Sequence, residues 1–428
     1  MKEGIFNMNE LKRITIIQSI IDKKRTQKEA AIALNISERQ IRNLLKCYRE
    51  QGPTGLKHKN KSHKPSHAFS HEFIDKIVML KLSDNYFDTN FSHFRDLLEE
   101  REHISISYSA LYNILKSHNI ISKKSHRDKK THRRRKRKEC EGMLVQTDGT
   151  PFDWFHIGHK FSLHGYIDDA TGKILGLYMC EHECLLGYLE ITRQMLKHYG
   201  SPIAIYSDKY SVFFPTKSQK ITIEEELQGK EKPTTQFKRI MDLLGIELIP
   251  ASTSQAKGRV ERLWETLQDR LTIEFKLNNI TTIEEANQFL PKYIEKYNKK
   301  FAVEPLSKEN KFIPLPSYID LNMLLTNKFT RIIDNSGTFS IQNKKFQIID
   351  NDILPKAKVN IYMSHKIGII VEYNKKRYKV VCLDNVPSTY STLTLNKFCK
   401  EYEATVKKFA TEICSYNSKE LSPLLTTS

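Results

Sequence analysis

The sequence predicts a multidomain α/β protein with helical modules at the N-terminus, a mixed α/β core and a small β-barrel at the C-terminus. Three observations predict this organisation. Apolar residues recur at helical spacing up to about residue 120. Strand and helix patterns alternate between residues 141 and 300, and only short strand patterns occur between 325 and 385. The length of 428 residues also indicates several domains rather than one.

We expect six segments along the chain. They are a helical domain (9–57), a second helical module (69–120), a basic linker (121–140), the core (141–300), the β-barrel (325–385) and a C-terminal tail (400–428). Each boundary follows a change in composition or in the period of the apolar residues.

Charge and composition limit the classes of protein to consider. The formal net charge of +19 indicates a polyanionic partner. No apolar run is long enough to cross a membrane, and no signal-peptide core occurs, so we expect a cytoplasmic protein. Seven cysteines without framework spacing indicate reduced thiols. Cys180, His182 and Cys184 lie close together but lack a second ligand pair, which disfavours zinc.

Residues 9–57 predict a helix-turn-helix. Thr26 with Glu29, and Ser37 with Gln40, match the capping box that begins a helix. Two short capped helices joined by a tight turn are typical of DNA-binding domains. We predict that the second helix contacts DNA through Arg39, Gln40, Arg42, Asn43 and Lys46. A plain helical hairpin with a charged face is the alternative.

Two further segments precede the core. Residues 69–120 predict a second small helical unit, in which Ser107 caps the last helix. This unit is either a second DNA-binding module or a structural domain. Residues 123–138 then contain eleven lysines or arginines and one acid. So dense a run repels itself and should stay extended until it meets phosphate, which favours a DNA-contacting linker.

The core begins with three strand patterns over 143–148, 160–167 and 173–179. A helix over 185–199, a buried strand over 203–207, a short helix over 237–244, a strand over 246–249 and a long helix from about 255 follow. This is the element order of an RNase H-like fold, in which the first and fourth strands are neighbours. Asp148 and Asp208, at the ends of these two strands, should therefore face each other.

The long helix has one apolar face, formed by Val260, Leu263, Leu267 and Leu271. Glu261 lies beside this face, with Lys257 one turn before it and Trp264 one turn after it on the same flank. Glu261 can therefore point over the edge of the sheet. We expect three arginines of this helix to point towards solvent, namely Arg259, Arg262 and Arg270.

The three acids Asp148, Asp208 and Glu261 suit phosphodiester chemistry. Two divalent cations about 3.5–4 Å apart can activate a nucleophile and stabilise the leaving oxygen. Such hard cations prefer oxygen ligands, and carboxylates crowded together repel each other unless a cation neutralises them. Three unrelated acids on a basic domain are the alternative, which the order and the element types of the three motifs disfavour.

The motifs around these acids resemble those of the integrase-core transposases of bacterial insertion sequences, within the retroviral-integrase superfamily and similar to the ISNCY-type group. They are VQTDGT (145–150), YSDKYSVF (206–213) and QAKGRVER (255–262), and the third is the most specific. The resemblance covers most of the chain. It implies that Asp148, Asp208 and Glu261 form a DDE triad that holds Mg²⁺, with Mn²⁺ as a substitute.

The chain departs from retroviral integrases at two places. The spacing between Asp208 and Glu261 is longer than in many integrases, and residues 215–236 look like an insertion that accounts for it. A helix-turn-helix also replaces the N-terminal zinc module. Among the remaining acids, Asp168 and Asp169 precede Ala-Thr-Gly and predict a structural turn, while Glu265 is the alternative third ligand.

Residues 329–384 contain five or six short strand patterns with hairpin-like turns at 335–337 and 374–376. This density of strands predicts a small β-barrel of SH3-like size. Its basic character fits a contact with DNA or protein, and a role in dimerisation fits equally.

The three motifs and the resemblance that they carry lead us to expect a DDE transposase. It would bind the terminal inverted repeats of its element, cleave each end and transfer the freed strand to target DNA as a homo-oligomer. Lys257 and Arg259 would position the DNA backbone. A nuclease that cleaves without joining is one alternative, and a DNA-binding regulator with a decayed core is another.

Overall fold

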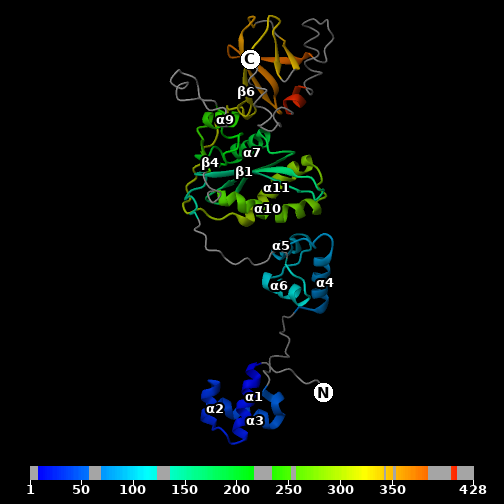
Figure 1. Cartoon of the computed structure of the whole chain (residues 1–428), viewed down its shortest axis with the longest axis vertical. Coiled ribbons are helices and arrows are strands. Elements are labelled where there is room, and N and C mark those ends of the chain that lie inside the picture. Colours follow the sequence, from blue (N-terminus) through cyan, green and yellow to red (C-terminus); the bar gives the residue numbers. More distant parts are fainter. Residues whose placement is uncertain are drawn as a thin grey trace. The chain divides into compact units, whose positions relative to one another are not determined.

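The computed structural model describes residues 8–56, 69–122, 135–215, 234–251, 257–341, 344–349, 353–383 and 406–411 (Figure 1). The chain divides into two compact units, Met1–Met79 and Leu80–Ser428. Most of the expected basic linker, nearly all of the expected insertion and most of the C-terminal tail lie outside the described residues. No helix in the described ranges is long and apolar enough to cross a membrane.

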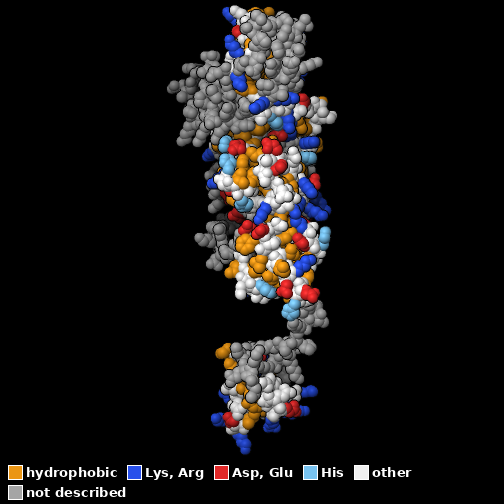
Figure 2. Space-filling model, turned by 90° about the vertical axis from the view of Figure 1, so that its right-hand side faces the viewer, with side chains coloured by type: hydrophobic (Ala, Val, Ile, Leu, Met, Phe, Trp, Pro, Cys, Tyr) orange, Lys and Arg blue, Asp and Glu red, His pale blue; other side chains and the backbone are white. Residues whose placement is uncertain are grey.

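The first unit is a three-helix domain made of α1 (Met8–Ile21), α2 (Gln27–Leu34) and α3 (Glu38–Gln51), followed by a 3₁₀ turn over Gly52–Leu56. Both predicted capping boxes are present, on Thr26 and on Ser37. Asn35 ends α2 in the left-handed conformation with φ 53°, which an asparagine tolerates and which makes the turn tight. Figure 2 shows lysine and arginine side chains at the edges of this unit, at the bottom of the view.

The helix α4 (His71–Leu82) contains the boundary between the two units, and α5 (Phe91–Arg101) and α6 (Tyr108–Ser117) follow it. Ser107 caps α6 by accepting a hydrogen bond from the backbone N–H of Ala110, as predicted. Three leucine and isoleucine side chains of α6 are buried, namely Leu111, Ile114 and Leu115. The helical character expected for 69–120 is therefore confirmed.

A five-stranded sheet lies at the centre of the second unit. Its strands are β1 (Val145–Phe152), β2 (Phe161–Asp168), β3 (Ile174–Cys180), β4 (Ala204–Ser207) and β5 (Glu247–Pro250), in the order β3-β2-β1-β4-β5. Strands β1, β2 and β3 form an antiparallel meander, and β4 lies parallel to β1 and to β5. The predicted meander and the predicted pairing of the first strand with the fourth are both confirmed.

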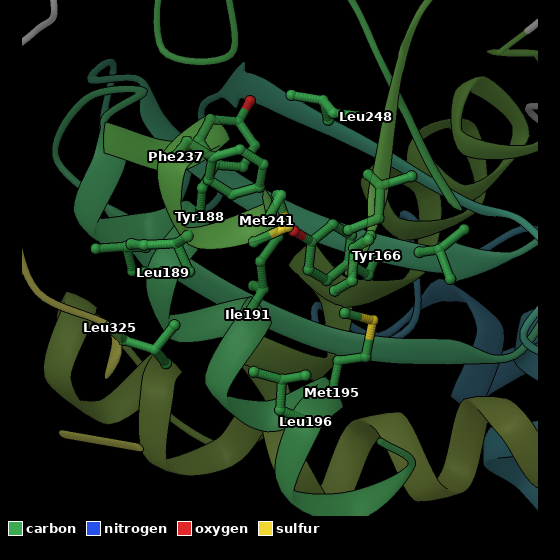
Figure 3. Packing of buried hydrophobic residues seen from close by; sticks show 14 of the residues in the cluster. Tyr166, Tyr188, Leu189, Ile191, Met195, Leu196, Phe237, Met241, Leu248 and Leu325 are labelled. Carbon is green, nitrogen blue, oxygen red and sulfur yellow. The ribbon is translucent and has the colours of Figure 1, made fainter. Parts of the chain in front are cut away.

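Helices cover both faces of this sheet (Figure 1). On one face, α7 (Leu185–His198) and α9 (Gln236–Leu243) pack on the sheet, and Tyr166, Tyr188, Met195 and Phe237 belong to the core between them (Figure 3). On the other face, α10 (Gly258–Leu277) and α11 (Ile283–Phe301) bury a separate apolar cluster. Because helices cover both faces of the sheet, its central strands are shielded from water. Polar side chains therefore gather at the ends of the strands.

One expectation about α10 is wrong. Arg270 does not point towards solvent, because its side chain is buried and its Nη1 lies 2.8 Å from Oδ2 of Asp96 in α5. Lys300 in α11 pairs with the same carboxylate. The helical pattern of α10 alone could not reveal this, because the partner comes from a module about 170 residues earlier.

The C-terminal part is a barrel-like six-stranded sheet, preceded by the short helix α12 (Leu321–Leu324). Its strands are β6 (Asn327–Ile332), β7 (Thr338–Ile341), β8 (Lys344–Ile348), β9 (Lys358–Ser364), β10 (Gly368–Tyr373) and β11 (Lys376–Cys382), in the order β6-β9-β10-β11-β8-β7. Asn374 and Lys375 both have positive φ and form the tight turn between β10 and β11, where a hairpin turn was expected.

Candidate catalytic site

The register of β1 and β4 brings Asp148 and Asp208 to the same level of the sheet. Gln146 pairs with Tyr206, so the residues two positions further along each strand lie at equivalent heights. Strand β4 ends at Ser207, one residue after this pair, and Asp208 begins the loop that follows. Strand β1 differs from expectation because it continues to Phe152 by pairing with β2, so Asp148 lies within the strand rather than at its end.

A single ammonium group joins the two aspartates. Nζ of Lys257 lies 2.7 Å from Oδ1 of Asp148 and 3.9 Å from Oδ2 of Asp208. The Lys257 side chain is 10% exposed and that of Asp148 is 23% exposed, whereas Asp208 is 45% exposed. The two carboxylates therefore converge on one positive charge at the edge of the sheet.

The N-terminal part of α10 is fixed to β1 by side chains on one flank of the helix. The indole Nε1 of Trp264 donates to Oδ2 of Asp148 at 3.3 Å, and Nε2 of Gln268 donates to Oγ1 of Thr150 at 3.3 Å. Trp264 can lie this close because Gly165 faces it from β2, where a Cβ would come within 2.7 Å of the ring. The carboxylate of Asp148 thus accepts one hydrogen bond on each oxygen.

Glu261 occupies the first turn of α10, three residues before Trp264. This spacing puts it on the flank of the helix that contacts β1. Its side chain is exposed and makes no hydrogen bond or ion pair with any residue that the structure describes. Within the described ranges no three His, Cys, Asp or Glu side chains are close enough together to hold a metal ion. The structure therefore brings Asp148 and Asp208 together, whereas Glu261 lies in the first turn of α10 without a contact to either aspartate.

Sequence analysis missed one further acid, Glu183. It lies in the loop between β3 and α7, and its Oε1 accepts a 2.5 Å hydrogen bond from the Tyr188 hydroxyl. Burial, and then the negative charges of Asp148 and Asp208, raise the pKa of Glu183 to about 7, although the Tyr188 hydrogen bond opposes this. Strands β1, β3 and β4 run in the same direction, so the loops after β3 and β4 leave the sheet at the edge where Asp148 lies. This strand order, had it been used, would have indicated Glu183.

Burial raises the pKa of Asp148 above its usual range, while the charge of Lys257 and its hydrogen bond act in the opposite direction. A buried carboxylate is costly as an anion without a cation nearby. Lys257 therefore stabilises the charged form of Asp148 in this structure.

Arg259 belongs to a second cluster, on Asp169. Its Nε lies 3.6 Å from Oδ1 of this fully buried carboxylate, which also pairs with Arg135 at the end of the basic linker. Nε2 of Gln146 donates to Asp169 at 2.9 Å, and Oε1 of Gln146 accepts from the backbone N–H of Val260 at 3.3 Å. Arg259 thus fixes the start of α10 to Arg135 in the basic linker.

Asp168 and Asp169 have the structural role that was expected. Asp168 accepts hydrogen bonds from the backbone and the hydroxyl of Thr171, both at 2.8 Å, as in an Asx turn. Cys180 and Cys184 are buried free thiols, and the five cysteines within the described ranges are all free.

The five predicted DNA-contacting residues lie on α3, and all five are exposed. Gln40 is partly committed to the fold, because its Oε1 accepts a hydrogen bond from the backbone N–H of Ser37 at 3.1 Å. The opposite side of α3 contributes Ile41 and Leu45 to the core of the domain. The helix therefore presents a polar face away from its own core.

Comparison with known proteins agrees with this organisation. A family profile described as a helix-turn-helix domain matches residues 12–66, so the first unit is a helix-turn-helix domain. The transposase for insertion sequence IS1202 of Streptococcus pneumoniae is 36% identical in an alignment of length 369 that covers 79% of this chain and 77% of that protein. The protein y4bF of Sinorhizobium fredii, also described as a transposase, is 33% identical over 82% of this chain and 75% of its own length.

The chain therefore belongs to the family of insertion-sequence transposases, which confirms the resemblance that the three motifs indicated. Among solved structures, the HTLV-2 integrase catalytic core domain in complex with magnesium is 15% identical, with a TM-score of 0.28 over 40% of this chain and 93% of that domain. A chain of the simian T-cell lymphotropic virus intasome is 16% identical, with a TM-score of 0.31 over 67% of this chain and 95% of that chain.

Proposed function

We propose that this transposase cleaves the ends of its insertion sequence and joins them to target DNA at a site formed by Asp148, Asp208 and Glu261. The observation that carries the proposal is the convergence of Asp148 and Asp208 on one cationic group, Nζ of Lys257. Family membership favours transposition over the two alternatives, a nuclease without joining activity and a DNA-binding regulator.

A divalent cation fits the two aspartates. An ammonium group already lies between their oxygens, and hard cations such as Mg²⁺ or Mn²⁺ prefer carboxylate ligands. Asp148 and Asp208 would hold the ion, and Glu261 would complete the set by turning its exposed side chain towards β1. When bound, the ion supplies activation of the attacking oxygen and stabilisation of the leaving oxygen.

The surrounding residues of the chain orient this site. The hydrogen bond from Trp264 fixes the rotation of the Asp148 carboxylate. Gln146 ties the first turn of α10, and therefore Glu261, to the strand that carries Asp148. Lys257 pairs with both aspartates in this structure, and it would become available to a DNA phosphate if a divalent cation took its place between the acids.

The helix-turn-helix supplies recognition of the element ends in this proposal. The exposed face of α3, with Arg39, Gln40, Arg42, Asn43 and Lys46, would enter the major groove. The basic linker would neutralise phosphates and make binding dependent on salt. Both ends of the element must be brought together for joining, so a homo-oligomer on DNA is expected, in the cytoplasm at the nucleoid.

The test uses a labelled duplex that carries the terminal repeat, incubated with the protein in Mg²⁺, Mn²⁺ or EDTA. Wild type should give metal-dependent nicked and joined products, and Asp208→Asn should give neither while binding the duplex as before. Asp242→Asn is a matched control, since this exposed acid on α9 pairs with Lys238 of its own helix. Nicking without joining would support the nuclease instead. Tight binding without cleavage in any metal would support the regulator.

A further inference from the structure

The end of the basic linker lies on the turn between β2 and β3. Nη1 of Arg137 donates to the carbonyl oxygens of Asp169 and Ala170, at 3.4 and 3.0 Å. The backbone N–H of Lys138 donates to Oδ2 of Asp169 at 2.8 Å. Residues 137 and 138 are therefore held against the catalytic core, beside its sheet.

Asp169 also holds two guanidinium groups that reach the surface. Its buried carboxylate pairs with Arg135 of the linker and lies 3.6 Å from Nε of Arg259, in the first turn of α10. Nη2 of Arg259 donates to the carbonyl oxygen of Arg135 at 3.4 Å. The Arg135 side chain is 38% exposed and that of Arg259 is 19% exposed. Arg135, Arg137 and Arg259 thus form an arginine cluster around Asp169, which is fixed in place but open to solvent.

The arginine cluster has more positive charge than the carboxylate that holds it. Burial lowers the pKa of Arg259, and the nearby charge of Arg137 lowers it further. Arg135 and Arg262 act in the same direction, whereas Asp169 opposes them. Each guanidinium group presents a planar fork of N–H donors that matches the oxygens of a phosphate. A phosphate bound among these groups would therefore relieve their repulsion.

The arginine cluster lies beside the carboxylates of the proposed catalytic site. Gln146 donates to Asp169 and accepts from the backbone N–H of Val260, and it precedes Asp148 by two residues on β1. Side chains two residues apart on a strand lie on the same face, about 6.6 Å apart. One strand of duplex DNA rises about 3.4 Å per nucleotide. A DNA strand whose reacting phosphate lies at Asp148 therefore meets the arginine cluster within a few nucleotides.

We propose that Arg135, Arg137 and Arg259 bind a phosphate of the DNA strand that passes through the catalytic site, a few nucleotides from the phosphate that is cleaved. This inference rests on the proposed function, because it names the part of the DNA substrate that is held beside that site. Asp169 fixes the guanidinium groups before DNA binds, so the end of the linker and the start of α10 receive the strand together. A cluster that only fastens the linker to the core is the alternative.

The test measures binding of the full chain to a fluorescent duplex that carries the terminal repeat, by anisotropy in EDTA so that no strand is cleaved. Single phosphates within about four nucleotides of the cleavage position are replaced, one at a time, by uncharged methylphosphonate. In wild type, one such replacement should weaken binding about tenfold, because hydrogen bonds to charged groups are strong. Arg137→Gln should bind the unmodified duplex about tenfold more weakly, and the same replacement should weaken its binding no further.

The matched control is Arg101→Gln, at the other end of α10. Arg101 also donates to a backbone carbonyl oxygen, that of Leu277, at 3.3 Å. Leu277 ends α10 and lies about 27 Å along the helix from Arg259, at a rise of about 1.5 Å per residue. This variant should bind the duplex as wild type does and should remain sensitive to the same methylphosphonate.

The salt dependence of binding separates a phosphate contact from a structural role. The logarithm of the binding constant falls with the logarithm of the salt concentration, by a slope of about 0.9 for each phosphate neutralised. Arg137→Gln should therefore reduce the slope by about 0.9, whereas Arg137→Lys keeps the charge and should retain the wild-type slope. A residue that only holds the linker would lower the Tm of the free protein and leave the slope unchanged.

The outcomes distinguish this inference from the proposed function. If wild type is insensitive to every replacement, or if Arg137→Gln keeps the sensitivity and the slope of wild type, the inference is wrong. Nicking and joining by wild type would leave the proposed function intact in that case. If the cluster passes both tests but wild type neither nicks nor joins in any metal, the proposed function is wrong and the cluster remains a DNA contact. Should Arg137→Gln fail to fold, Arg259→Gln replaces it with the same expected results.

Discussion

Replacing Lys257 with methionine should destabilise the metal-free protein and strengthen its binding of a divalent cation. Methionine keeps most of the apolar stem but removes the charge that lies 2.7 Å from Asp148 and 3.9 Å from Asp208. Removing one partner of a buried ion pair costs about 3–5 kcal/mol. Because Asp148 is 23% exposed and can take up a proton, we expect a smaller loss, about 2–3 kcal/mol.

The same change removes a competitor for the metal. In the wild type an ion must replace the ammonium group between the two carboxyl groups, whereas in Lys257→Met no ammonium group competes for them. Urea unfolding without Mn²⁺ measures the loss of stability, and urea unfolding with Mn²⁺ measures the gain in metal binding. A ligand that binds only the folded protein raises its free energy of unfolding, and the rise grows with the logarithm of the ligand concentration divided by Kd. The stabilisation by Mn²⁺ should be larger in the variant.

The control is Lys238→Met, which removes a more exposed lysine of the second unit that pairs with Asp242 on its own helix. An exposed pair of this kind contributes little to stability. If Lys257→Met loses the same free energy with and without Mn²⁺, Lys257 does not occupy the place of the metal. The explanation for the convergence of Asp148 and Asp208 would then be refuted.

Three further predictions concern the framework of the site. Gly187→Ala should lower the free energy of unfolding by about 3 kcal/mol or more, because its Cβ would lie 2.4 Å from the His164 ring. The control is Gly258→Ala, whose Cβ would enter open space. In the same urea titration this control should change the free energy of unfolding little. Gly165→Ala should displace Trp264, whose ring would lie 2.7 Å from the new Cβ, and a strand-transfer assay should show reduced activity; unchanged activity would mean that the indole does not orient the site. Because burial lowers the pKa of His164 from 6.5 to about 4, its neutral form contributes stability that is complete above pH 6.5 and is lost as the pH falls towards 4. The free energy of unfolding should fall by about 3 kcal/mol over this range, and denaturant titrations at several pH values measure it. A free energy of unfolding that does not change with pH over this range would contradict a buried neutral ring.

Local patterns were sufficient for much of the fold. The capping boxes on Thr26 and Ser37 depend only on side chains three residues apart, and both are present. The pairing of β1 with β4 followed from the order of the elements, and it places Asp148 and Asp208 at one level. The extension of β1 to Phe152 was not predicted, because residues 149–152 include a glycine and a proline and become a strand only through pairing with β2.

The predicted site was only partly visible in the sequence. Asp148 and Asp208 follow apolar strand patterns, so their convergence could be inferred before the structure was known. Arg270 looked like a surface residue, because its burial depends on Asp96 from a separate helical module. Glu183 follows no motif, and it lies beside Gly149 only because β3 ends at the same edge of the sheet as β4.

The sequence by itself determined which segments are helices and strands, the family, and the two aspartates of the proposed site. These features depend on periodicity, caps and short motifs, which involve residues close together in the chain. The tertiary structure decided which charges meet: Lys257 with Asp148, across 109 positions, and Glu183 beside Gly149. Such contacts depend on how strands are ordered and how helices pack, and a pattern within one segment contains no information about a partner that another segment supplies.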